Sequence, residues 1–87
     1  MNITRKVYKD RIEWTNESGE LHRLDGPAYE FETYNAWYIN GKLDREDGPA
    51  VEWINGHKKW YLNGKEYSEE EFNNYILKKR LQKILEL

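Results

Sequence analysis

The chain has 87 residues, no cysteine and a formal net charge of −2. A chain of this length forms one small domain, and the lack of cysteine excludes disulfides and cysteine-based zinc sites. The near-balanced charge argues against a general nucleic-acid binder, which carries a basic field, and against a strongly acidic DNA mimic.

Two copies of a repeat occupy the middle of the chain. Residues 25–28 and 47–50 both have the sequence Asp-Gly-Pro-Ala, and Trp-Tyr-Ile-Asn-Gly-Lys at 37–42 returns as Trp-Tyr-Leu-Asn-Gly-Lys at 60–65. Self-similarity at a fixed period is the signature of a repeat architecture. A weaker earlier copy begins at Ile12, so we expect about two and a half units.

Each unit is predicted to be a β-hairpin. Apolar and polar residues alternate along 51–53 and 59–62, which is the period of a half-buried strand. Asn55-Gly56 lies between these runs, and Asn-Gly favours tight hairpins because both residues tolerate positive φ. We therefore expect an antiparallel meander over about residues 11–67, in which each hairpin needs its neighbour for stability.

A helix is predicted over residues 68–87. Ser68 and Glu71 form a capping box, and neither Gly nor Pro follows them. At about 100° per residue, Phe72, Tyr75 and Ile76 share one apolar face. This face is expected to pack on the last hairpin and cover the open end of the repeats.

A second apolar stripe lies on another side of the same helix. It comprises Leu77, Leu81, Ile84 and Leu85. Its four-then-three spacing is the beginning of a coiled-coil seam. Two interpretations stay open, since the stripe can meet another chain, either its own copy or a target, or a bent helix can bury both stripes internally.

The repeated Asp-Gly-Pro-Ala segments allow a chemical and a structural interpretation. Asp25 and Asp47 are candidates for paired carboxylates that bind a cation or act as acid and base. Alternatively, Asp bonds the backbone of its turn, Gly avoids a clash before proline, and proline starts a strand. Because both copies keep the whole formula, we favour the structural interpretation.

Catalytic and metal-binding arrangements are not evident in the sequence. His22 is expected in a polar strand and His57 at an exposed hairpin end, with no spacing that suits a metal or a nucleophile. The sequence predicts a protein that is not an enzyme and has no cofactor or metal.

The aromatic residues suggest a surface ladder. Trp37 and Trp60 should lie on one face of successive units and Tyr38 and Tyr61 on the other, with one ladder in the core and the other exposed. An exposed ladder beside Lys58 and Lys59 suits partner binding. Stacking on a nucleotide or on single-stranded nucleic acid is the alternative, although a nucleic-acid partner is not favoured.

The two motifs at this period resemble the MORN-like β-hairpin repeats, especially a variant of small proteins from bacteria, bacteriophages and large DNA viruses. The resemblance covers about residues 12–67. It departs from the usual pattern because Asp-Gly-Pro-Ala replaces a Gly-x-Gly step. The resemblance implies a scaffold or interaction role and no catalytic residue.

These observations predict an α+β fold: a hairpin meander over residues 1–67, capped by a helix over residues 68–87. The predicted function is a non-catalytic protein-binding module, and analogy suggests a phage-encoded inhibitor or regulator of a host enzyme or defence complex. A nucleotide binder and a homo-oligomeric structural module are the alternatives. No apolar run exceeds residues 36–39, and no secretory signal is evident, so we expect a cytoplasmic protein without a membrane span.

Overall fold

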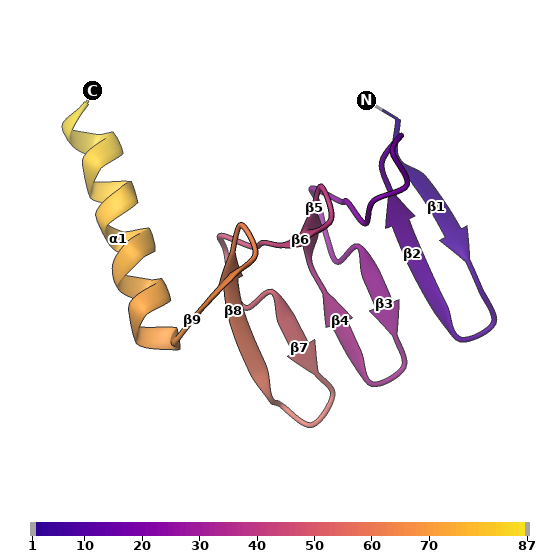
Figure 1. Ribbon diagram of the computed structural model, residues 1–87. Helices are drawn as coiled ribbons and strands as arrows, with labels where there is room; N and C mark the ends of the chain where they lie inside the picture. The colour runs from indigo at the N-terminus through magenta and orange to yellow at the C-terminus, as the bar shows by residue number, and fades with distance from the viewer. Residues whose placement is uncertain (1, 87) are drawn as a thin grey trace.

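The computed structural model describes residues 2–86, which form a repeating β-sheet followed by one helix (Figure 1). The strands are β1 Thr4–Val7, β2 Arg11–Thr15, β3 Tyr29–Phe31, β4 Tyr34–Ala36, β5 Tyr38–Ile39, β6 Lys42–Leu43, β7 Val51–Trp53, β8 Lys58–Leu62 and β9 Lys65–Tyr67. The helix α1 spans Glu69–Leu85. The predicted α+β fold, an antiparallel meander with one C-terminal helix, is confirmed.

Seven strands make one antiparallel sheet in the order β1-β2-β3-β4-β7-β8-β9, while β5 and β6 form a short separate hairpin. Three long hairpins lie side by side along the sheet, and β1 completes the first of them without carrying the repeat motif (Figure 1). The first half of β8 pairs with β7 and its second half with β9. In the preceding unit the segment that corresponds to β8 is not one continuous strand, because Trp37 separates β4 from β5.

The Asn-Gly dipeptides make two different turns. Asn40 and Gly41 have φ of 48° and 80°, which suits a two-residue type I′ hairpin, and residues 63 and 64 repeat this geometry. At Asn55-Gly56 only the glycine has a positive φ, and the Trp53 N–H donates to the His57 carbonyl at 2.9 Å across a three-residue loop. A hairpin at 55–56 was the correct prediction, but positive φ at Asn55 was the wrong reason.

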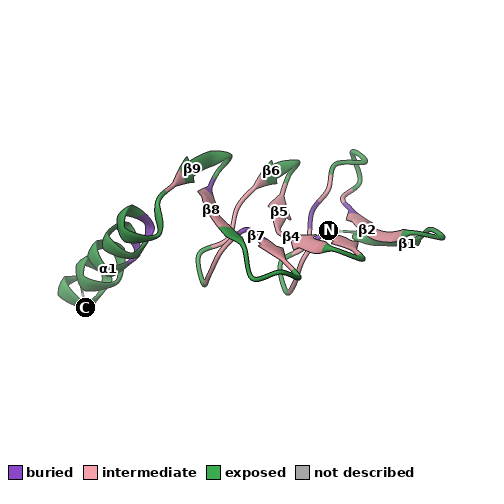
Figure 2. Ribbon diagram, turned by 90° about the horizontal axis from the view of Figure 1, so that it is seen from below, coloured by how far each residue is buried: buried purple, intermediate pink, exposed green. Residues whose placement is uncertain are grey.

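The buried core is small and mostly aliphatic. Its members are Ala28, Ala36, Ala50, Val51, Leu62, Phe72 and Ile76. Among the described residues Phe72 is the only buried aromatic side chain, so the idea that one ladder of Trp or Tyr forms the core is wrong. In Figure 2 the helix lies at the end of the sheet and not across one of its faces, so the Trp and Tyr side chains of the two ladders are only half-buried.

The helix packs on the last edge of the sheet. Ser68 accepts a hydrogen bond from the Glu71 N–H, and the Glu71 side chain accepts one from the Ser68 N–H, as the capping box predicts. Phe72 and Ile76 then pack with Leu62 of β8. Every described residue of the chain after Ile76 is exposed. No helix within residues 2–86 is long and apolar enough to cross a membrane.

Candidate protein-binding surfaces

An arginine holds each Asp-Gly-Pro-Ala segment in place. Arg45 donates from Nε to Asp47 at 2.8 Å and from Nη1 to the Pro49 carbonyl at 3.0 Å. It also donates to Glu52 at 3.0 Å, and its guanidinium carbon lies 3.8 Å from the centroid of the Trp37 ring. We call this arrangement the arginine bracket. It fastens a loop to the strands of the following hairpin and covers a tryptophan of the preceding one.

Arg23 makes the same bracket one unit earlier. It donates to Asp25 at 2.9 Å and to the Pro27 carbonyl at 3.2 Å, lies 3.5 Å from Glu30, and covers Trp14 at 3.8 Å. The signal for this residue was present in the sequence, since both copies have arginine two positions before the aspartate.

The bracket adds a role to those that the sequence suggested for the motif. A Cβ added to Gly48 would lie 3.0 Å from Cζ of Arg45, and one added to Gly26 would lie 2.8 Å from Cζ of Arg23. The guanidinium therefore lies across each glycine, so that an added Cβ would displace the arginine side chain, and neither position has a positive φ. Each aspartate bonds its arginine, and this hydrogen bond lowers the pKa of both Asp25 and Asp47.

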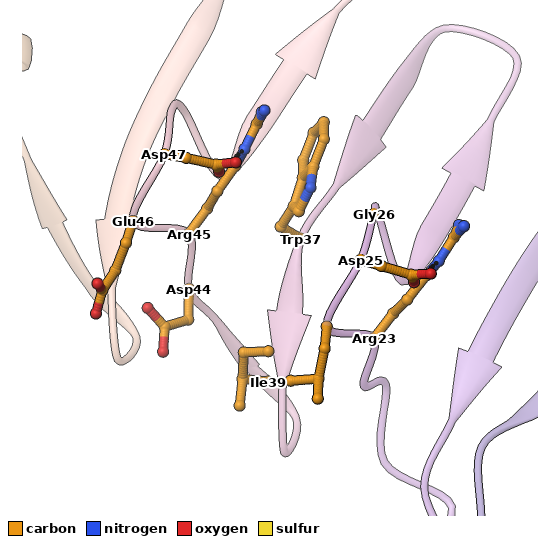
Figure 3. A pocket seen from close by; sticks show the side chains of 10 residues that line it. Arg23, Asp25, Gly26, Trp37, Ile39, Asp44, Arg45, Glu46 and Asp47 are labelled. Atoms are coloured by element: carbon orange, nitrogen blue, oxygen red, sulfur yellow. Dashed lines mark hydrogen bonds and ion pairs between the residues drawn. The ribbon is translucent and has the colours of Figure 1, made fainter.

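A cleft of about 630 Å³ separates the two brackets (Figure 3). Trp37 stands inside it, with Arg45 and Asp47 on one side and the Asp25-Gly26 loop on the other (Figure 3). Asp25 and Asp47 are each paired with the arginine of their own bracket. Within the described residues, no group of three or more His, Asp or Glu is placed to hold a metal ion.

The two histidines differ sharply. His57 is exposed at a hairpin end, where its ring lies 5.0 Å from that of Trp53. His22, expected in a polar strand, is only 2% exposed. Its Nδ1 accepts the Asn40 N–H at 2.9 Å, and its buried Nε2 has no hydrogen-bond partner among the described residues. His22 therefore supports the β5–β6 turn through this hydrogen bond and is inaccessible to solvent.

The continuous row of aromatic rings does not include the residues of the two predicted ladders. Rings from three neighbouring strands stack in a row on one face of the sheet, with centroids 5.5 to 6.3 Å apart: Tyr29, Phe31, Tyr34 and Trp53. All four are half-buried. Burial raises the pKa of Tyr29, with Tyr34 adding to the effect. Cross-strand packing of this kind stabilises a sheet that has no second layer.

The four predicted sheet residues of the binding surface are divided between β5, which pairs with β6, and β8, which pairs with β7 and β9. Tyr38 and Tyr61 are half-buried, and burial raises the pKa of Tyr38, with Tyr34 and Tyr61 contributing. Lys58 is exposed, whereas Lys59 is half-buried and lies 3.9 Å from Glu66. Lys58 and Lys59 point to opposite faces of β8 because they are consecutive residues of one strand. They do not form a single basic patch.

The four predicted helix residues lie together and exposed. Leu77, Leu81, Ile84 and Leu85 are 56%, 51%, 63% and 86% exposed. In Figure 2 the buried part of α1 faces the sheet and the rest of the helix is open to solvent. We call these four side chains the outer face of α1. They point away from Phe72 and Ile76, so the helix does not bend to bury both stripes.

Comparisons of the chain with protein-family models, with curated proteins and with solved structures give no match.

Proposed function

We propose that this chain is a small non-catalytic protein-binding module that docks through the outer face of α1. The observation that carries the proposal is the row of four large apolar side chains, each at least half exposed, within nine residues of one helix. Exposed apolar side chains scattered singly are ordinary, but a contiguous set on one helix face is typical of an interface.

The size of this face limits how tightly it can bind alone. Covering the four side chains removes the equivalent of at least two apolar side chains from water, which contributes about 3–6 kcal/mol. Association itself costs at least about 4 kcal/mol in lost motion and side-chain order. The outer face therefore needs further contacts around it to form a specific complex.

The sheet favours a protein partner over a nucleotide. The rings of Tyr29 and Tyr34 stack nearly parallel, 5.7 Å apart and with planes at 25°, so each covers a face of the other. Trp37 has Arg45 over one ring face. A nucleobase needs free ring faces on which to stack. The narrower idea of a phage-encoded inhibitor or regulator of a host enzyme or defence complex rests on analogy and stays a prediction.

The test is affinity capture with matched variants. The variant Leu81→Asp, Ile84→Asp changes the outer face, and Leu24→Asp, Ile54→Asp makes the same changes at residues 77% and 81% exposed elsewhere. We expect a specific protein retained by the wild type and by the control, then confirmed with purified components, to be lost with the outer-face variant. Equal retention by all three would refute the outer face as the docking surface.

A further inference from the structure

Two basic side chains border the outer face of α1. At 3.6 residues per turn, Lys78 lies about 20° beyond Leu85 on one side, and Arg80 lies about 40° beyond Ile84 on the other. Both are exposed, and neither forms an ion pair with any described residue. Lys79, in contrast, points toward the sheet and pairs with Glu46 at 2.7 Å. Lys78 thus points away from the sheet, whereas Arg80 lies nearer to it and also lines the clefts between α1 and the loop of Glu46 and Asp47.

These charges oppose pairing of the outer face with a second copy of the chain. In a parallel helix pair, the edge of one helix that carries Lys78 would meet the edge of the other that carries Arg80. In an antiparallel pair, each of these edges would meet the same edge of the other copy. Both arrangements put like charges at the rim, where they weaken association. The apolar contact spans only residues 77–85, about 12 Å along the helix. The apolar area that it would bury in a helix pair is therefore small compared with that of a stable dimer, and it does little to offset the charge repulsion.

We infer that the outer face of α1 binds an amphipathic helix of another protein, one whose apolar stripe is bordered on both sides by glutamate or aspartate. This inference rests on the proposed function. The spacing of Leu77, Leu81 and Ile84 matches a helix seam. Carboxylates on the partner would meet Lys78 and Arg80 in either helix direction, which adds the contacts that the small apolar area lacks.

The probe is a pair of labelled helical peptides with the same leucine stripe, one flanked by glutamate and the other by lysine. Fluorescence anisotropy measures their binding to the full chain at low salt. We expect the glutamate-flanked peptide to bind about tenfold tighter or more, and the preference to shrink as salt rises. The variant Lys78→Glu, Arg80→Glu, checked for its fold by circular dichroism, should prefer the lysine-flanked peptide.

Two further measurements separate this inference from the proposed function. The uncharged variant Leu81→Gln, Ile84→Gln should lose binding to both peptides. If both peptides bind equally and this variant loses them, the acidic partner is refuted while the docking face stands. If binding survives in this variant, the outer face itself is refuted. Failure of the glutamate-flanked peptide to bind, or self-association of the wild type that is tighter than its binding to this peptide, would also overturn the inference.

Discussion

Replacing Arg45 with methionine removes the guanidinium of the second bracket while keeping an unbranched side chain. The contact with Asp47 contributes about 0.5 kcal/mol or less, because that carboxylate is 81% exposed and screened by water. The half-buried hydrogen bonds to Pro49 and Glu52 contribute about 1 kcal/mol each. The stacking on Trp37 adds about 0.5–1 kcal/mol. We therefore expect Arg45→Met to lower the free energy of unfolding by about 2.5–3.5 kcal/mol.

Urea unfolding followed by circular dichroism measures this loss, and the melting temperature should fall by roughly 10–20 °C. Arg45→Lys should lose most of the same free energy, because an ammonium cannot make the three directed hydrogen bonds and lie flat on an indole. Arg80→Met, at an exposed helix position, should change stability by less than about 0.5 kcal/mol. If Arg45→Met costs no more than Arg80→Met, the bracket does not stabilise the fold.

Three further predictions follow from the same contacts. Gly48→Ala should destabilise the wild type but cost less in the Arg45→Met background, because the added Cβ meets the guanidinium; equal costs in a double-mutant cycle would contradict this. The pKa of Asp47 in the folded chain lies below its ordinary value of 3.8. The stability that the Asp47 carboxylate contributes to the fold is therefore complete well above pH 3.8, and it is lost as the pH falls through the folded-state pKa. The stability difference between wild type and Asp47→Asn, measured by urea unfolding at pH 6 and near pH 2, should therefore shrink in acid. Phe72→Ala should lower the free energy of unfolding by about 3 kcal/mol and Leu81→Ala by under about 0.5 kcal/mol, because only Phe72 is buried. Similar losses for the two variants in thermal unfolding would show that Leu81 packs within the fold and is not available to a partner.

The helix and the period of the hairpins could be predicted because each depends on local residues. The capping box at Ser68 needs only residues within one turn, and the Asp-Gly-Pro-Ala motif marks the same loop in each copy. Local spacing is enough for such inferences because the interactions lie within a few positions of each other. Two apolar stripes on one helix also indicate two contact surfaces, but their spacing does not decide whether Leu81 and Ile84 are exposed or are buried by a bent helix.

The arginine bracket and the aromatic row depend on contacts that sequence spacing does not encode. Arg45 reaches Glu52 and Trp37 only because β4, β7 and the intervening loop meet in one register. Tyr34 meets Trp53 because they are cross-strand partners. Half-burial of the aromatic side chains was missed because alternation shows which residues share a face, not whether a second layer covers it. The Asn55-Gly56 turn likewise depends on loop length, which strand pairing decides.

The bracket over each tryptophan also explains where the array stops. Arg23 covers Trp14 and Arg45 covers Trp37, but the position corresponding to Arg45 after Trp60 is Ser68, where the helix begins. The helix packs against Trp60 instead, through Phe72 and Ile76. The chain is thus a linear array of hairpins that ends in the helix. Adding or removing one unit of 22 or 23 residues would change the distance between the first hairpin and the helix, yet leave the surroundings of the outer face unchanged.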